Sequence, residues 1–373
     1  PWYDGTSFAA NGDVVVVSIN YRMGAFGFTD LSRFGDEYAT SGINGILDQI
    51  VALEWVRDNI TNFGGDPEQV TIAGESAGGF AVGTLLGTER AQGLFHRAIP
   101  QSGAAHHTMS ATAGKIVSDL FLKELDVETM DALQDVSADD ILKAQGRIDM
   151  SVQRGDEDLG EKVSPFYPVT GNEILPISPL DAIRNGVGRN VDVLTGTNKD
   201  EATLFIMSDV SEDKLNREVK GYGGDESLLE AYSSNLSGAS TTELSVALST
   251  DFTFRIPAVR FAEARCSHDA KTWVYLFNWE SRNSKLKATH ALEIPFVFNN
   301  LAKAGVDVFI GKGPLPQAVA DTMHNAWTGF IREGDPGWQN YELKDRATMC
   351  FDNDSTVEMD PGQFRREAWE GIR

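Results

Sequence analysis

The chain has 373 residues, of which 41% are hydrophobic and 23% charged. These proportions are ordinary for a globular protein with a sizeable core, built as one large domain or two smaller ones. Asp and Glu number 55 against 32 Lys and Arg, which gives a formal net charge of −23. This charge repels nucleic acids and anionic lipids, so neither is expected as a partner. A solvated acidic surface is a simpler interpretation than the attraction of cationic substrates.

Two further features bear on the compartment. No apolar run reaches the roughly 18 residues of a membrane span, so no membrane association is expected. Cys266 and Cys350 are the two cysteines. Because two thiols do not make a disulfide framework, we expect both to be packing residues of a protein in a reducing compartment, the cytoplasm.

The first part of the chain alternates short strands with helices. A β-branched run predicts a buried strand over 14–19, and apolar residues at helical spacing predict a helix over 44–63. A second buried strand is expected over 70–73, a helix rich in small residues over 76–86, and a third strand over 98–102. This rhythm favours an α/β fold, with a mostly parallel central sheet flanked by helices.

Beyond residue 108 the pattern changes to acidic, amphipathic helices. Helices such as 113–125 and 138–146 predict a helical insertion over roughly 108–171, and several short helices predict a second one over 210–265. No internal repeat or low-complexity linker is present, so a single domain over 1–373 is the preferred interpretation. The remaining elements expected are strands at 191–195, 272–277, 349–351 and 356–359, a helix over 317–332, and a polar terminal helix.

A Gly-x-Ser-x-Gly motif, Gly74-Glu75-Ser76-Ala77-Gly78, lies between the strand at 70–73 and the following helix. In this context the motif is typical of a nucleophile elbow, where a serine occupies a sharp strand-to-helix turn. Glycines on either side allow the neighbouring elements to approach closely. The turn also places Ser76 at a helix N-terminus, where the N–H of Ala77 can donate to an oxyanion. We therefore expect Ser76 to be a nucleophile.

Long stretches of the chain resemble the type-B carboxylesterase family, which includes the cholinesterases, and look nearest to its bacterial para-nitrobenzyl-esterase-like members. The resemblance covers essentially the whole chain and implies the α/β-hydrolase fold. The matching stretches are Tyr3-Asp4-Gly5, Gly12 to Val17, Asn20 to Gly24, Gly45 to Gln49, Phe63 to Pro67, the elbow, Gln101-Ser102-Gly103, Asn198 to Glu201, and His290 to Phe298.

The resemblance implies a Ser-His-Glu triad. Ser76 matches the nucleophile, Glu201 the acidic member and His290 the base, and the chain order Ser, acid, His is that of α/β-hydrolases. Ser102 matches a buried serine that hydrogen-bonds near the triad, and Glu75 a carboxylate that flanks the nucleophile. The resemblance also assigns a structural role to a pair, Arg22 and Asp48, that ties a strand to a helix.

Other residues compete for these roles. Asp200 is the nearest rival of Glu201, since both follow the strand at 191–195. Among the histidines after Glu201, His268 lies in a polar stretch that predicts a surface turn, and His324 lies within the helix at 317–332. The adjacent pair His106-His107 lacks the further ligands that a metal site needs, so no metal is expected.

Two departures from the family pattern stand out. Residue 291 is Ala where many relatives have Gly. Family members also carry an H-G-G-type loop shortly before the segment matching Tyr3-Asp4-Gly5, and its N–H groups supply the other oxyanion donors. This chain begins at Pro1, after that loop. We therefore expect that about 100 upstream residues, including the first strands of the fold, belong to the working protein. They would be joined to this chain or carried on a separate one.

The function implied is that of a serine carboxylesterase acting on a small-molecule ester through an acyl-enzyme on Ser76, without a cofactor. The substrate pocket is expected near Phe80, Phe205 and the residues numbered in the 250s. A hydrolase of amides or carbamates, or an acyltransferase, would use the same triad, because pocket shape and water access decide between them. A non-catalytic, cholinesterase-like binding protein is disfavoured, because such proteins lack triad members and all of them are present here.

Overall fold

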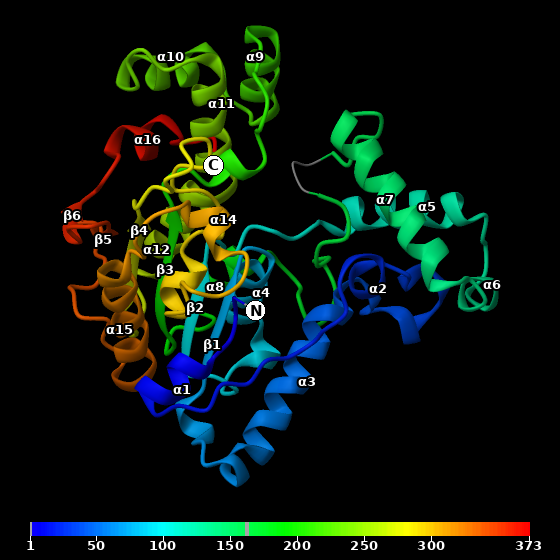
Figure 1. Cartoon of the computed structure of the whole chain (residues 1–373). Helices are drawn as coiled ribbons and strands as arrows, with labels where there is room; N and C mark the ends of the chain where they lie inside the picture. Colours follow the sequence, from blue (N-terminus) through cyan, green and yellow to red (C-terminus); the bar gives the residue numbers. More distant parts are fainter. Residues whose placement is uncertain (1, 161–163) are drawn as a thin grey trace.

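The computed structural model describes residues 2–160 and 164–373, so residues 161–163 of the insertion predicted over 108–171 lie outside the described residues. At its centre lies a mixed sheet whose strands follow one another in chain order (Figure 1). The first five strands are parallel and the last is antiparallel. The strands are β1 (Thr71–Glu75), β2 (Arg97–Gln101), β3 (Asp192–Asn198), β4 (Thr272–Phe277), β5 (Ala347–Phe351) and β6 (Thr356–Met359).

Helices cover both faces of this sheet, as the alternation of strand side chains shows. Ala98 and Val193 point into a core shared with α3, α4 and α5. Their neighbours Ile99 and Leu194 point to the opposite face, into a core shared with α1, α13 and α15. The sheet is therefore the middle layer of an α/β fold, as predicted. These helices are α1 (Thr6–Gly12), α3 (Asn44–Asn59), α4 (Ala77–Leu86), α5 (Ala111–Leu125), α13 (Ile294–Val297) and α15 (Gln317–Glu333).

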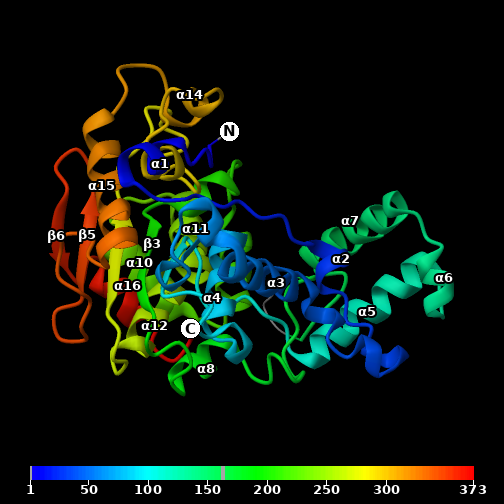
Figure 2. The same ribbon diagram turned by 90° about the horizontal axis from the view of Figure 1, so that it is seen from below.

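The other helices gather largely in two groups outside these layers. In Figures 1 and 2, α6 and α7 lie together beside α2 and α5, on the side of α5 that faces away from the sheet. The helices from α9 to α12 fall within the range predicted as the second insertion. None of the described helices is long and apolar enough to cross a membrane. Their bounds are α2 (Gly24–Phe28), α6 (Met130–Gln134), α7 (Ala138–Arg154), α8 (Pro179–Arg184), α9 (Glu212–Gly221), α10 (Glu226–Asn235), α11 (Thr241–Thr250), α12 (Ile256–Arg265), α14 (Val306–Ile310) and α16 (Gln363–Ala368).

One predicted strand is wrong. Residues 14–19 are extended, but they pair with no strand of the described chain, and four of their apolar side chains are exposed. Val15, Val16, Val17 and Ile19 are 41–43% exposed. A cavity of about 1520 Å³ lies between this segment and β1, the edge strand, and both line it. The segment therefore has no neighbouring strand within hydrogen-bonding reach. Just after this segment, Arg22 contacts Asp48 of α3, with a guanidinium–carboxylate distance of 2.6 Å.

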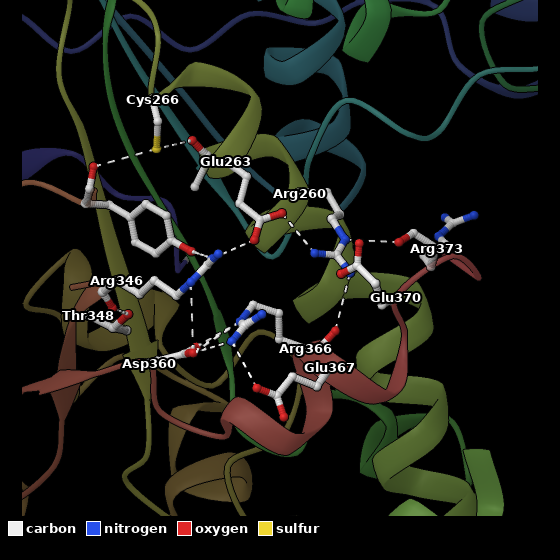
Figure 3. A network of polar contacts seen from close by, with 12 residues as sticks. Arg260, Glu263, Cys266, Arg346, Thr348, Asp360, Arg366, Glu367, Glu370 and Arg373 are labelled. Carbon is white, nitrogen blue, oxygen red and sulfur yellow. Dashed lines mark hydrogen bonds and ion pairs between the residues drawn. The ribbon is translucent and has the colours of Figure 1, made fainter. Parts of the chain in front are cut away.

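A polar network fastens the C-terminal segment to the sheet layer (Figure 3). Glu263 of α12 accepts hydrogen bonds from Arg260 at 2.9 Å and from Arg346, which directly precedes β5. Arg366 of α16 pairs with Asp360, just after β6, at 2.7 Å. These partly buried groups join α12, the β5–β6 pair and α16. Glu263 connects α12 to the start of β5, and Asp360 connects the β5–β6 pair to α16.

Replacement of Glu263 by Gln should therefore destabilise the fold. The variant keeps the shape of the side chain but loses the charge that two arginines contact. We expect the free energy of unfolding to fall by about 1.5–3 kcal/mol, since hydrogen bonds to charged groups contribute in that range. Denaturant-induced unfolding measures this change. The matched control is Glu230→Gln on the exposed face of α10, and an equal effect of the two substitutions would contradict the prediction.

Candidate active site

The serine of the motif lies at a strained turn. Ser76 directly follows β1 and precedes α4, with φ 55° and ψ −119°, a conformation that L-residues rarely adopt. The glycines around it allow close packing of the backbone. A Cβ on Gly74 would lie 2.4 Å from the backbone of Gly78, and one on Gly79 would lie 2.5 Å from the carbonyl oxygen of Gln101. The predicted elbow is therefore present, and only glycine fits at these two positions.

The structure brings the three predicted triad residues together. Nε2 of His290 lies 2.8 Å from Oγ of Ser76, and Nδ1 of His290 lies 2.6 Å from Oε2 of Glu201. Ser76 follows β1, Glu201 follows β3, and His290 lies on the loop after β4. Since parallel strands end at the same edge of a sheet, residues far apart in the sequence meet there. A continuous hydrogen-bonded chain results, from hydroxyl to imidazole to carboxylate.

Glu201 is fully buried and its second oxygen is also satisfied. Oε1 accepts a hydrogen bond from the hydroxyl of Ser102 at 2.6 Å and one from the backbone N–H of Asn198 at 2.7 Å. Such bonds are required, because an unpartnered buried carboxylate is costly. The rival Asp200 instead accepts from the backbone N–H of Ala288 at 3.3 Å. The structure therefore brings Glu201, and not Asp200, to the imidazole, and Ser102 lies next to Glu201.

Two more carboxylates lie around the imidazole. Oε1 of Glu75 lies 3.2 Å from Nε2 of His290, on the nitrogen that also faces Ser76. Its other oxygen accepts from the hydroxyl of Tyr3 at 3.2 Å. Glu293, which the sequence reasoning missed, is fully buried and accepts from the side chain of Asn198 at 2.7 Å. The sequence feature that could have identified Glu293 is its position three residues after His290, because this spacing returns to the same side of a helical turn.

These acids and the histidine control one another's protonation. Burial acts to lower the pKa of His290, but Glu201, Glu75 and Glu293 act the other way and raise it to about 9. Burial raises the pKa of Glu75, and the charge of Glu293 adds to this effect. Burial also raises the pKa of Glu293, and the charge of Glu201 adds to it. The acids around His290 therefore stabilise its imidazolium once the ring takes up a proton.

Ala77 is the first residue of α4, next to Ser76. The first N–H groups of a helix have no partner within the helix, so this N–H is suited to receive negative charge that develops beside the serine. The oxyanion role of Ala77 stays a prediction that this position allows.

The other histidines occupy different places. His324 is buried in α15, where its Nδ1 lies 2.8 Å from the carbonyl oxygen of Val297. His268 lies partly buried, with Nε2 2.8 Å from the carbonyl oxygen of Ile183, rather than free on the surface. His107 stacks on the ring of Phe80. Within the described ranges, no group of three or more His, Cys, Asp or Glu could hold a metal ion.

Comparisons with known proteins identify similar proteins over most of the chain. A model described as "Carboxylesterase family" matches residues 1–364. The chain is 37% identical to the para-nitrobenzyl esterase of Bacillus subtilis, over 98% of this chain and 75% of that protein. It is 30% identical to a phenmedipham hydrolase of Pseudarthrobacter oxydans, over 94% of this chain and 71% of that protein. The solved carboxylesterase EST55 of Geobacillus stearothermophilus has a TM-score of 0.88 at 37% identity, over 99% of this chain and 78% of that one.

The contact between Glu75 and His290 predicts a change in protonation. Because a neighbouring carboxylate stabilises the imidazolium, Glu75→Gln should lower the pKa of His290 by about one pH unit. NMR titration of labelled histidine measures the midpoint. Glu128→Gln, an exposed acid far along the chain, should leave that midpoint unchanged. A midpoint in Glu75→Gln that stays the same or rises would show that Glu75 does not act on the imidazole.

Proposed function

Because the chain belongs to the carboxylesterase family, we propose that it hydrolyses carboxylic esters through an acyl-enzyme intermediate on Ser76. The observation that carries this proposal is the unbroken chain of hydrogen bonds from Ser76 through His290 to Glu201, at 2.8 and 2.6 Å. Hydroxyl, imidazole and carboxylate in this order are the parts that acyl transfer needs.

In the first half of the reaction, His290 removes the proton of Ser76 while Oγ attacks the ester carbonyl carbon. Glu201 fixes the imidazole with Nδ1 protonated and Nε2 free, and it stabilises the imidazolium that forms. The carbonyl oxygen becomes an oxyanion and receives the N–H of Ala77. His290 then passes its proton from Nε2 to the leaving alcohol, and the acyl group stays on Ser76.

In the second half, water takes the place of the alcohol. His290 removes a proton from this water, which attacks the acyl carbon, and the proton then returns to Oγ of Ser76 as the acid leaves. Ser102 and Asn198 hold the carboxylate of Glu201 through both halves. Glu75, with Oε1 3.2 Å from Nε2, lies where it can stabilise the imidazolium that forms in each half.

A purely binding role would not require the backbone strain at Ser76. A residue in a sparsely populated conformation costs roughly 1–3 kcal/mol, and such strain persists where the surroundings impose it, often at catalytic sites. Here the strain aims Oγ at an imidazole that is itself oriented by a buried acid. This combination supports catalysis over a binding function.

The assignment of Ser76 can be tested directly. Ser76→Ala should lower kcat/KM for a p-nitrophenyl ester by at least about 10⁴-fold, because the nucleophile is lost. A serine-directed phosphonate probe should label the peptide that contains Ser76, as mapped by mass spectrometry. Ser110→Thr, at the start of α5, serves as the control substitution of a serine outside the site. Full activity in Ser76→Ala, or labelling of another peptide, would contradict the assignment.

We further propose that a segment preceding Pro1 in the working protein, joined to this chain or on a separate one, completes the site. The cavity of about 1520 Å³ between residues 13–21 and β1 supports this. It has an edge strand on one side and an extended, unpaired backbone on the other, which suits an added strand. Tyr3, Glu75 and Ala77 also line this cavity, so an occupant would reach the nucleophile and could donate to the oxyanion.

Residues 1–373 alone should therefore be a poor catalyst. Loss of one oxyanion donor lowers kcat by about 10²–10³-fold. We expect such a loss for the isolated chain against the full-length protein, and recovery of activity when the upstream segment is added as a separate polypeptide. A polypeptide of the same composition in scrambled order is the control. Equal activity of the isolated chain and the full-length protein would contradict this proposal.

We also propose a reducing compartment, the cytoplasm, as the location of the protein. Both Cys266 and Cys350 are free thiols. Cys350 is buried in β5 and Cys266 is half-buried, so both serve as packing residues. Cell fractionation with detection of the native protein tests this location.

A further inference from the structure

Two amide side chains from neighbouring strands hold the carboxyl group of Glu293. Its Oε1 lies 3.2 Å from Nε2 of Gln101, the last residue of β2. Its Oε2 lies 2.7 Å from Nδ2 of Asn198, the last residue of β3. All three side chains are buried. Since bulk water does not reach this carboxyl group, its protein partners decide which of its protonation states is stable.

An indole fixes the orientation of the Gln101 amide. Nε1 of Trp327, on α15, lies 2.9 Å from Oε1 of Gln101. An indole N–H can only donate a hydrogen bond, so it must face the amide oxygen and not the NH₂ group. Trp327 is itself buried and cannot exchange this bond for one to bulk water. The NH₂ group of Gln101 is therefore turned toward Glu293.

A carbonyl group fixes the orientation of the Asn198 amide. Nδ2 of Asn198 lies 2.7 Å from the backbone oxygen of Thr289, and the same nitrogen contacts Glu293. Because a carbonyl oxygen can only accept, the NH₂ group must lie between these two partners. Each oxygen of Glu293 thus accepts from an N–H donor of fixed orientation. A proton on either oxygen would meet such a donor and break its hydrogen bond.

The two donors act against effects that favour a proton on Glu293. Burial raises the pKa of this carboxyl group to about 7 and the charge of Glu201 adds to it, whereas the bond from Asn198 lowers it. His324, on the same helix as Trp327, contacts the carbonyl oxygen of Val297 instead. The titratable groups that face Glu293 are His290, Glu201, Glu75, Tyr275 and Tyr3. Of these, His290 is the group that becomes a cation, and the charge of Glu293 raises its pKa.

We propose that Gln101, fixed by Trp327, is a positioning residue that keeps Glu293 ionised, and that this buried charge sets the pH at which His290 becomes a base. The proposal rests on the proposed esterase function, in which His290 must be neutral to remove the proton of Ser76. Without the donor from Gln101, Glu293 binds a proton at a higher pH than in the wild type. The imidazolium then loses a stabilising charge and releases its proton at a lower pH.

The test follows the titration of His290 by NMR in the full-length protein. In Gln101→Leu the amide is lost, and we expect the midpoint of His290 to fall by about one pH unit. Trp327→Phe lets the amide turn and should cause a smaller fall, which also covers the case that Gln101→Leu does not fold. Trp273→Phe is the matched control, because it removes another buried indole bond, to the carbonyl oxygen of Trp338, and should leave the midpoint unchanged.

A double variant shows whether Gln101 acts through Glu293. Glu293→Gln removes the charge, so it should lower the midpoint of His290 at least as much as Gln101→Leu does. Addition of Gln101→Leu to this variant should cause no further fall. The acid limb of kcat/KM for p-nitrophenyl acetate should move with the midpoint in each active variant, to lower pH.

The other outcomes overturn the proposal in distinct ways. A further fall in the double variant would show that Gln101 acts by another route than Glu293. An unchanged midpoint in Glu293→Gln would show that Glu293 carries no charge in the wild type. A lower kcat at every pH with an unchanged midpoint in Gln101→Leu would make Gln101 a merely structural residue. Failure of the esterase function looks different, because Ser76 would then not react with a phosphonate while the midpoints of His290 would still shift.

Discussion

The backbone at Ser76 is the constraint on which the site depends. A positive φ of 55° directs the side chain out of the line of β1 and lets α4 begin at the next residue. Gly74 before the turn and Gly79 after it allow this conformation, because any side chain at these two positions would block the close backbone contacts. The resulting turn places one hydroxyl within 2.8 Å of an imidazole and beside the free N–H groups of a helix. Neither contact would survive if the turn relaxed.

Around this turn the protein concentrates negative charge in its interior. Glu75, Glu201 and Glu293 all lie near His290, and each has at least one polar partner from the protein. Burial of such groups is unfavourable unless hydrogen bonds and opposite charge offset it. The imidazolium formed during the reaction supplies that opposite charge. The same electrostatics that raise the pKa of His290 therefore stabilise the charged state through which acyl transfer passes.

Much of the fold follows from local sequence patterns, and some of it does not. The strands at 272–277 and 347–351 are recognisable in the sequence because nearly all their side chains are buried, which leaves a clear apolar run. The strand at 14–19 shows the same pattern, yet it is unpaired here because pairing depends on a neighbour and not on the run itself. Ser76, Glu201 and His290 could be assigned because motif, chain order and family resemblance agreed. Glu293 and the packing of Phe254 on His290 are tertiary contacts, and no single-sequence pattern specifies their geometry.

Replacement of Glu201, the carboxylate that contacts His290, offers the most direct test of the triad. In Glu201→Gln the side chain keeps its shape and can still accept from Ser102, but it can no longer hold His290 with Nδ1 protonated. We expect kcat for ester hydrolysis by the full-length protein to fall by about 10⁴-fold, as a wrong imidazole tautomer does in a hydroxyl–imidazole–carboxylate triad. The unfolding curve should stay close to that of the wild type. A kcat within a few-fold of the wild-type value would contradict the claim that Ser76, His290 and Glu201 act as one unit.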